Sequence, residues 1–392
     1  MASTFIYRFR ELPGLGSGGA LGTSKYLVLT LPYRRKPPQL YGGTGPVHRA
    51  EWPLLTEDQL IEHIAKAVPS IRGASARAGL RIGIGHDAAL GAPRPGYEWA
   101  LHSDAFLDGV HFHAATYPPD SVGYKSLARA TSDLAAVGAS PRFFLLTLTL
   151  PAGRTGKWLD GFLRGMAHAS RVYGIRLAGG DTSKTERISI SITVVGEIRR
   201  GLALTRSGAR PGHSIYVSGR LGRAALGLEL MNRLRRRAKA KGTAELVRLL
   251  KPHLYPSSRV ELGSWLAENR VASAMMDLSD GLSTDLHRLC KASRVGARLD
   301  AAEVPCVKIP AEASRALRGR RLDPLRLALD GGEDYELLFT VPPQNLKRLQ
   351  DAPGFSELAA IGEVERGKGI TVVETDGREW SLKPGGWDPF AV

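Results

Sequence analysis

Six aspartates stand close to serine or glycine at five separate places in this chain, and together they could form a site for chemistry on charged ligands. In the stretch 100–112, Ser103-Asp104 follows a short apolar run and precedes Gly109 and His111. The other aspartates of this kind are Asp87, Asp133, Asp181, Asp277 and Asp280. Because a carboxylate at the end of a strand points into the crevice where ligands bind, the pattern predicts one shared acidic site.

The chemistry that suits such a site is metal-assisted handling of phosphate. Carboxylates gathered at one place raise one another's pKa and destabilise a fold unless cations neutralise them. Mg²⁺ prefers oxygen ligands and commonly binds through one or two carboxylates together with the phosphates of a substrate. Gly179-Gly180 and Gly281 lack side chains and would let backbone amides approach phosphate oxygens. We therefore expect a triphosphate bridged by more than one ion.

Each of these residues also has a purely structural interpretation. An aspartate can cap a helix or stabilise a turn. A lone histidine such as His111 is more often structural than catalytic, and a tryptophan such as Trp387 more often belongs to a core. Five acidic clusters in one chain favour a shared site over unrelated structural roles. The sequence contains no Walker motif, no kinase-type His-Arg-Asp loop and no Gly-x-Ser-x-Gly elbow, so phosphate chemistry here must use another fold.

Length and composition indicate a globular chain with two domains. Its 392 residues exceed one ordinary core, and 43% of them are hydrophobic. The net charge of +16 lies largely in the N-terminal arm and in the run 233–241, without interleaved aromatic residues, so we interpret it as a solvated face and expect no nucleic acid partner. The apolar runs are too short to span a bilayer. Cys290 and Cys306 have neither metal-ligand spacing nor a framework of pairs, which favours free thiols in a reducing compartment.

The chain is expected to divide into an arm and two domains. Residues 1–55 are rich in Gly, Pro and Arg, lack a helical or strand period, and predict a disordered basic arm that also resembles a transit peptide or an over-extended gene start. The run Gly14 to Gly19 matches a dinucleotide fingerprint in letters alone, because no strand precedes it and no helix follows. A capping-box pattern at Thr56 begins the first domain, over 56–200, and a Gly-rich connection begins the second, over 201–392.

Hydrophobic periodicity predicts strands and helices in both domains, so the fold class is α/β or α+β. Strands are expected at 81–84, 99–101, 143–150, 188–198, 215–218, 272–277, 297–300, 335–341, 359–364 and 370–374. Helices are expected from residue 60 to about 68, and at 122–137, 158–173, 224–234, 259–268 and 281–292. The order of the strands cannot be read from periodicity.

From about residue 56 to residue 392 these motifs resemble the thiamine-monophosphate kinase family, whose superfamily includes aminoimidazole ribonucleotide synthetase and selenophosphate synthetase. The segments that carry the resemblance are 83–87, 103–112, 132–138, 179–181, 204–209, 277–281, 331–336 and 386–387. The Gly-Gly-Glu-Asp-Tyr-Glu run at 331–336 and the Gly386-Trp387 pair favour the kinases over their relatives.

The resemblance implies a fold, an activity and a set of site residues. It implies a two-domain synthetase-like fold, in which the N-terminal mixed sheet binds ATP and Mg²⁺ and pairs with a second subunit to form a shared barrel, and the C-terminal domain is α/β. The implied activity is direct in-line transfer of the γ-phosphoryl group of ATP to thiamine monophosphate, with no covalent residue. The implied metal ligands are Asp87, Ser103, Asp104, Asp133, Asp181, Asp277 and Asp280. The implied nucleotide contacts are Gly180, Asp181, Arg206 and Ser279, and the implied substrate contacts are His111, Glu333 and Trp387.

The expected partners are therefore ATP, thiamine monophosphate, several Mg²⁺ ions and a second copy of the chain, in the cytoplasm. Two residues depart from the family pattern: His86 replaces a second acid beside Asp87, and His102 replaces Ser or Thr before Ser103. The rival hypotheses are a related ATP-dependent synthetase with another small acceptor, and a non-catalytic relative that binds nucleotide or nucleic acid.

Overall fold

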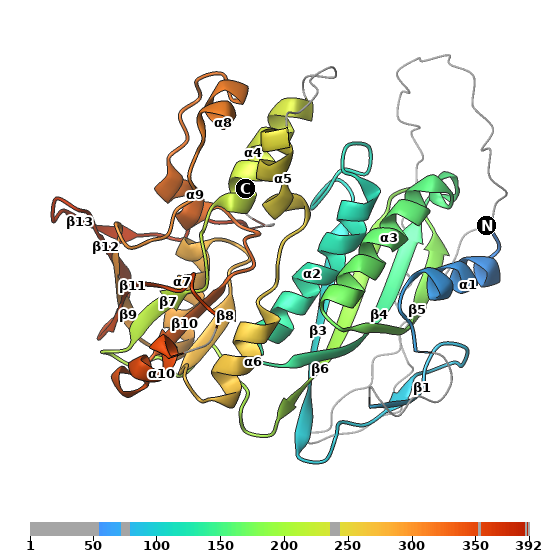
Figure 1. The fold of residues 1–392 in the computed structure, drawn as a ribbon, viewed down its shortest axis with the longest axis horizontal. Coiled ribbons are helices and arrows are strands. Elements are labelled where there is room, and N and C mark those ends of the chain that lie inside the picture. Colours follow the sequence, from blue (N-terminus) through green and yellow to red (C-terminus); the bar gives the residue numbers. More distant parts are fainter. Residues whose placement is uncertain (1–54, 72–78, 236–243, 352–353, 389, 391–392) are drawn as a thin grey trace, which may run out of the picture. The chain divides into compact units, whose positions relative to one another are not determined.

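The structure is a computed structural model that describes residues 55–71, 79–235, 244–351, 354–388 and 390 (Figure 1). The arm expected over residues 1–55 therefore lies, except for Leu55, outside the described residues. The first helix of the described residues is the predicted one, α1 (Glu57–Ala67), where the Thr56 side chain accepts from the Gln59 backbone and the Gln59 side chain accepts from the Thr56 backbone. This reciprocal capping box satisfies two N–H groups that a helix start leaves without partners.

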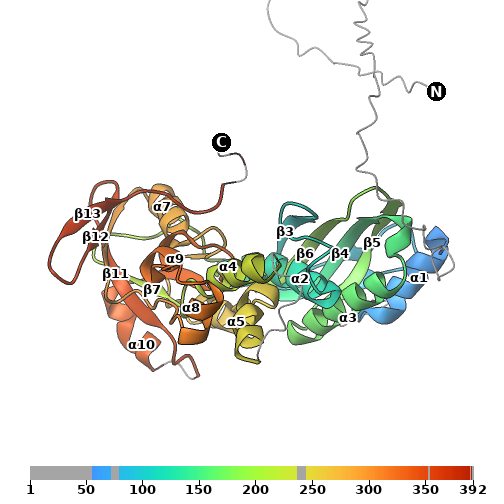
Figure 2. The ribbon, with the colours of Figure 1, turned by 90° about the horizontal axis from the view of Figure 1, so that it is seen from above.

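A four-stranded mixed sheet forms the first half of the fold. Its strands follow in the order β3 (Tyr97–Leu107), β6 (Ser189–Arg199), β4 (Ser140–Leu150) and β5 (Arg176–Lys184). Neighbours are antiparallel except for the parallel pair β4 and β5. The helices α2 (Pro119–Val137) and α3 (Lys157–Val172) cover one face of this sheet (Figure 2). A short hairpin of β1 (Leu80–Ile82) and β2 (Leu90–Gly91) precedes it.

The strand that carries the central aspartate is longer than predicted. The sequence predicted a strand over 99–101 that ends before Ser103-Asp104, but β3 is paired with β6 from Tyr97 to Leu107. The prediction was wrong because serine and aspartate break the apolar run, whereas pairing to a neighbouring strand continues through them. Successive side chains of a strand point to opposite faces. His102 and Asp104 therefore lie on one face of the sheet and Ser103 on the other.

A seven-stranded sheet forms the second half. Its order is β13 (Glu379–Leu382), β12 (Ile370–Val373), β9 (Gly296–Asp300), β11 (Ala359–Glu365), β7 (Ser214–Val217), β10 (Leu337–Val341) and β8 (Ala274–Asp277). All neighbours are antiparallel except β12 and β9. The apolar face of α7 (Leu282–Ser293) packs on one side of this sheet. On the other side lie α6 (Val260–Glu268) and α10 (Leu346–Gln350).

Several elements were not predicted from the sequence. They are β2, β5, β13, α5 (Ala244–Leu254), α8 (Ala311–Ala316), α9 (Pro324–Asp330) and α10. Most are too short for a period to show, α5 contains Pro252, and β5 contains the pair Gly179-Gly180, which has low strand propensity. The predicted helix at 224–234 is α4 (Arg223–Arg235). Within the described residues, no helix is long and apolar enough to cross a membrane.

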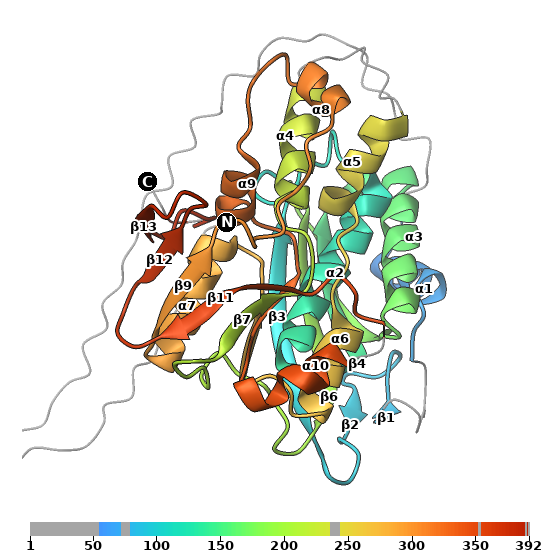
Figure 3. The same ribbon diagram turned by 60° about the vertical axis from the view of Figure 1, so that its left-hand side comes forward.

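Helix α2 joins the two halves, because it packs on α3 and on the first sheet and also contacts α6 and β8 of the second half (Figure 3). Glycines permit the close approach of α2 and α3. A Cβ atom on Gly123 would lie 1.9 Å from the Phe162 backbone oxygen, and one on Gly165 would lie 1.8 Å from the Asp120 backbone oxygen. Both distances are far inside contact range, so backbone packs directly against backbone here.

We predict that Gly165→Ala lowers the free energy of unfolding by about 1 kcal/mol or more, because overpacking outweighs the gain of about 1 kcal/mol in helix propensity. Urea denaturation followed by circular dichroism measures the change. Gly153→Ala is the matched control, because a Cβ atom there meets nothing within 4 Å. Equal stability of the Gly165→Ala variant and the parent protein would contradict the packing argument.

Candidate active site

A cavity of about 1120 Å³ is lined by residues of both halves. Most of the site residues that the sequence indicated lie along it: His111, Asp104, Asp133, Arg206, Asp277, Ser279, Asp280, Glu333 and Trp387. They come from β3 and the loop after it, α2, the connection between the halves, the end of β8, the loop before α7, the segment 331–336 and the C-terminal segment. The fold thus gathers residues that are far apart in the sequence.

Four indicated residues do not line this cavity: Asp87, Ser103, Gly180 and Asp181. Asp87 and its neighbour His86 are exposed in the turn after β1. Ser103 and Asp181 are exposed on the face of the first sheet opposite to the one that α2 and α3 cover, and Ser103 Oγ lies 3.0 Å from Thr193 Oγ1. For Gly180 the structure gives a packing reason, because a Cβ atom there would lie 1.8 Å from the Leu146 backbone oxygen.

The acidic core of the cavity is the pair Asp133 and Asp277. Asp133 lies within α2 rather than at a helix cap, and the Asp277 side chain is buried and accepts a hydrogen bond of 2.8 Å from Ser132 Oγ. Burial, and then the charge of Asp104, raises the pKa of Asp133 to about 7. Burial, and then the charge of Asp133, raises the pKa of Asp277 to about 7. The charge of Arg206 acts in the opposite direction on the pKa of both carboxyl groups but does not cancel the increase.

Basic side chains flank the other acids. The guanidinium of Arg129 pairs with both oxygens of Asp104, with Nε at 2.6 Å and Nη2 at 3.1 Å. Arg288 pairs with Asp280 and, at 2.8 Å, with the buried Asp285. His102, one of the departures from the family pattern, places Nε2 3.1 Å from Asp133 Oδ2. Its ring therefore belongs to the cavity wall, whereas His86 does not.

The contacts of His111 favour one neutral tautomer. Its Nδ1 accepts the backbone N–H of Leu107 at 3.1 Å, so the proton of the neutral ring is on Nε2. Burial, and then the charge of Arg129, lowers the pKa of the imidazole, which favours this neutral form. His111 can therefore donate one hydrogen bond from Nε2 to a ligand.

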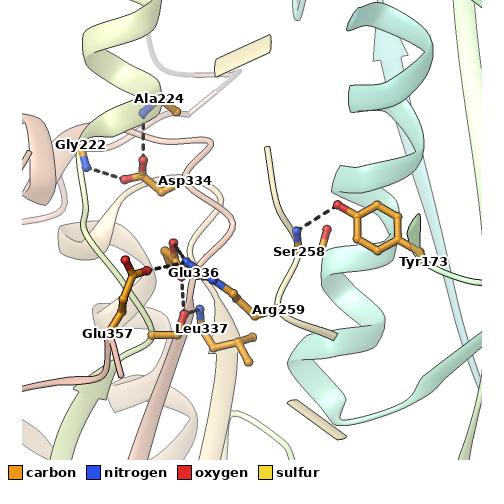
Figure 4. A network of polar contacts seen from close by, with 10 residues as sticks. Tyr173, Gly222, Ala224, Ser258, Arg259, Asp334, Glu336, Leu337 and Glu357 are labelled. Carbon is orange, nitrogen blue, oxygen red and sulfur yellow. Dashed lines mark hydrogen bonds and ion pairs between the residues drawn. The ribbon is translucent and has the colours of Figure 1, made fainter. Parts of the chain in front are cut away.

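The segment 331–336 holds its three acids by three different parts of the fold. Glu333 lies at the cavity, where Lys125 and His253 contact it. The Asp334 carboxylate accepts the backbone N–H groups of Gly222 and Ala224 at the start of α4, at 2.6 and 3.0 Å (Figure 4). Arg259 donates two hydrogen bonds of 2.6 Å to the Glu336 carboxylate. Only the first of these acids faces the cavity, because the other two are engaged elsewhere.

The backbone of this segment is strained at two non-glycine residues. Glu333 has φ of 69° and Tyr335 has φ of 52°, both in the left-handed region. Such residues persist only where the surroundings fix them, and they concentrate at functional sites. Here the backbone N–H of Glu333 bonds to the Ser279 oxygen at 2.8 Å and that of Tyr335 bonds to the Leu278 oxygen at 2.9 Å. The segment is thereby tied to the loop that carries Asp280.

Sequence reasoning missed the charged residues that position the acids, chiefly Lys125, Arg129, His253 and Arg288. Lys125 and Arg129 stand one helical turn apart in α2 among buried alanine, leucine and valine residues. A charge on the apolar face of a predicted helix was the available signal, because a buried charge needs a partner. His253 carried no such signal, since it lies in α5, which was not predicted.

The carboxylates of the cavity are suited to a cation that takes its remaining ligands from phosphate and water. Among the residues that the structure describes, no three His, Cys, Asp or Glu side chains are close enough together to hold a metal ion without help. Mg²⁺ usually takes only one or two carboxylates and completes its shell with water and phosphate oxygens. Asp133 and Asp277, with their raised pKa values, have the chemistry of such ligands.

Each half of the chain matches a known protein family. Residues 85–198 match the family described as AIR synthase related protein, N-terminal domain, and residues 210–374 match the corresponding C-terminal domain. The two halves together therefore form the two-domain fold of the AIR synthase related proteins.

Comparison with individual proteins shows which enzymes of this fold the chain resembles in sequence. The thiamine-monophosphate kinase of Escherichia coli K12 is 39% identical over 324 residues, which cover 81% of this chain and 94% of that protein. The crystal structure of the Stenotrophomonas maltophilia enzyme of the same name is 36% identical, with a TM-score of 0.66 over 81% of this chain and 96% of its own. A structure of AaThiL complexed with AMPPCP and TMP is 30% identical, with a TM-score of 0.65 over 85% of this chain and 97% of its own. The chain belongs to the thiamine-monophosphate kinase family.

The raised pKa values of Asp133 and Asp277 give a prediction for the pH dependence of stability. Between the ordinary aspartate pKa of about 4 and a folded pKa of about 7, the folded protein binds more protons than the unfolded chain. Stability without metal should therefore fall as pH rises through this window. Asp133→Asn removes one charge and should raise the melting temperature by about 2 °C or more at pH 7.5, and by less at pH 4.5.

The measurement is differential scanning fluorimetry with a chelator present. Asp351→Asn serves as the control, because Asp351 is exposed and should give the same small change at both pH values. A gain for Asp133→Asn that does not depend on pH would contradict the electrostatic explanation.

Proposed function

We propose that the protein transfers the γ-phosphoryl group of ATP to thiamine monophosphate and so makes thiamine diphosphate and ADP. The observation that carries this proposal is a single cavity in which four of the aspartates indicated by the sequence and several arginines stand beside Glu333, His111 and Trp387. The complex of the relative AaThiL with AMPPCP and TMP supports it. A donor nucleotide and a phosphorylated acceptor both need such a mixture of charges.

The reaction needs positioning and charge neutralisation rather than a covalent residue, because the acceptor phosphate is already a nucleophile. When bound, Mg²⁺ would be held by Asp133, Asp277, Asp104 and Asp280 and would supply positive charge to the phosphate oxygens. Arg129 lines the cavity and keeps Asp104 in place, and its buried Nη1 atom has no hydrogen-bond partner within the described part of the chain. Arg206, on the connecting segment, also lines the cavity. These guanidinium groups are suited to phosphate oxygens.

The acceptor would bind at the part of the cavity formed by His111, Glu333 and Trp387. Trp387 is 51% exposed, so the face of its ring is accessible to a cationic ring. Its backbone N–H donates a hydrogen bond of 3.0 Å to the backbone oxygen of Asp280. A cation–π contact of this kind contributes about 1 to 2 kcal/mol when water is excluded. His111 can donate from Nε2, and Glu333 can accept.

We further propose a division into a domain over 56–200, which binds ATP and metal, and a domain over 201–392. The family matches, one ending at residue 198 and the other beginning at residue 210, support this division. The roles of Asp87, Ser103, Gly180 and Asp181 as metal or nucleotide contacts stay predictions, because these residues do not line the cavity of the single chain.

We propose that two copies of the chain pair through the face of the first sheet that bears Ser103 and Asp181. Within the described residues no helix covers this face, and its side chains include Leu101 of the edge strand β3, 65% exposed, and Leu145 of the inner strand β4, 36% exposed. Exposed leucines on an uncovered sheet face favour a partner. A second sheet packed there would form the shared barrel that the sequence resemblance implies.

The activity has a direct test. Purified protein with ATP, Mg²⁺ and thiamine monophosphate should form thiamine diphosphate, and Asp104→Asn should lower kcat by about 10² to 10³, because it removes a preorganised charge. Asp351→Asn should keep the parent rate. Liquid chromatography of the products follows the reaction. Absence of thiamine diphosphate, or a phosphoenzyme that accumulates before acceptor is added, would sink the proposal.

The dimer can be tested through Leu101. Leu101→Arg places a charge on the uncovered face and should convert a dimer to a monomer in size-exclusion chromatography with light scattering. Val172→Arg, on an exposed residue at the end of α3, should leave the dimer intact. A parent protein that is monomeric at micromolar concentration, or a dimeric Leu101→Arg variant, would rule out this interface.

A further inference from the structure

Glu333 is held by a buried hydrogen-bond chain that extends through three other elements. Lys125 Nζ in α2 lies 2.7 Å from Oε1 of Glu333, and His253 Nδ1 in α5 lies 3.1 Å from Oε2. The far side of the imidazole, Nε2, lies 2.9 Å from the hydroxyl of Tyr117, in the loop before α2. Both oxygens of one carboxylate therefore have a partner from a different helix.

The contacts fix the direction of each hydrogen bond. Nδ1 of His253 lies 3.1 Å from the Glu333 carboxylate and 3.5 Å from Lys125 Nζ, and the shorter contact, to an acceptor, favours a proton on Nδ1. Nε2 of the neutral ring then accepts from the Tyr117 hydroxyl. Burial, and then the charge of Lys125, lowers the pKa of His253, which keeps the ring neutral. Burial alone would raise the pKa of Glu333, but Lys125 and His253 hold it well below its usual range. Glu333 is thus a carboxylate throughout the neutral pH range.

Stability alone does not explain why Lys125, His253 and Glu333 are buried together. The side chains of Lys125 and His253 are each 1% exposed, and that of Glu333 is 24% exposed, at the cavity. Apolar residues of similar volume often stabilise a fold as well as a buried ion pair does. Lys125 and His253 contact the one acid of the segment 331–336 that faces the cavity, and that acid has a strained backbone. Their arrangement therefore serves the orientation of Glu333.

We propose that Lys125 and His253 are positioning residues for thiamine monophosphate, because they fix the Glu333 carboxylate in one orientation at the cavity wall, where it meets the cationic end of the acceptor. This inference rests on the proposed function. Since Lys125 balances the charge of Glu333, the carboxylate recognises the acceptor through a directed hydrogen bond or ring contact more than through net charge. ATP, which is anionic, makes no use of this contact.

Five charged or titratable groups of the described residues act on Glu333. Besides Lys125 and His253, they are Arg129 in α2, His111 after β3 and Tyr335 in the same segment. Lys125→Met would remove the closest cation, and burial would then raise the pKa of Glu333. The KM for thiamine monophosphate should consequently become dependent on pH in this variant and fall as pH rises from 6 to 8, while that of the parent stays flat.

The test compares KM for thiamine monophosphate, KM for ATP and kcat. Lys125→Met should raise KM for thiamine monophosphate about tenfold or more, as expected for loss of a hydrogen bond to a charged group, and change KM for ATP less than about threefold. In a Glu333→Gln background the same substitution should add less than about threefold. Lys66→Met, on an exposed residue of α1, is the control and should match the parent.

A second pair of variants guards against misfolding at position 125. His253→Asn keeps a donor near the place of Nδ1 and should retain most of the affinity for thiamine monophosphate, whereas His253→Leu should lose it. Equal increases in both KM values, additive effects of the Lys125 and Glu333 substitutions, or equal behaviour of the two His253 variants would overturn the inference. Parent protein that forms no thiamine diphosphate would instead overturn the proposed function.

Discussion

The negative charge of one cavity is the constraint on which the rest of the structure depends. Asp104 and Asp280 are balanced by Arg129 and Arg288, but among the described residues neither Asp133 nor Asp277 forms an ion pair with an arginine or lysine. In the proposed function, positive charge that enters with a ligand would relieve this repulsion. Stability is thus given up where binding needs a high density of carboxylates, a compromise common at functional sites.

The segment 331–336 meets the opposite requirement, since each of its acids is fully committed to a partner. Asp334 is bound by backbone N–H groups at the start of α4, Glu336 by Arg259, and Glu333 by Lys125 and His253. The left-handed backbone at Glu333 and Tyr335 would not persist without these anchors. In the proposed function, one cavity wall therefore offers partly compensated negative charge to ions and phosphate, and another offers a rigid carboxylate to the acceptor.

The sequence predicted much of this arrangement, and its failures have physical causes. Most strands and helices appear where periodicity placed them, because that signal is local, and nine of the indicated site residues line one cavity. The end of β3 was wrong, since pairing to β6 carries the strand through Ser103 and Asp104. The positioning groups could not be predicted, because Lys125 meets Glu333 only after residues about 200 apart in the chain come together. Such contacts leave no trace in spacing.

The glycine contacts of α2 have a consequence for how such an enzyme could change during evolution. This helix carries Lys125, Arg129 and Asp133 on one rigid rod. Gly123 and Gly165 let it pack closely on α3 near its N-terminus. An added Cβ on Gly263 of α6 would lie 2.2 Å from the Ala135 backbone oxygen, so α2 is also closely packed near its C-terminus. A shift of α2 would disturb together the groups that we propose for metal binding, phosphate contact and acceptor orientation. New acceptor preferences would therefore arise more readily in the C-terminal segment around Trp387, where a substitution alters one contact and leaves the helix unmoved.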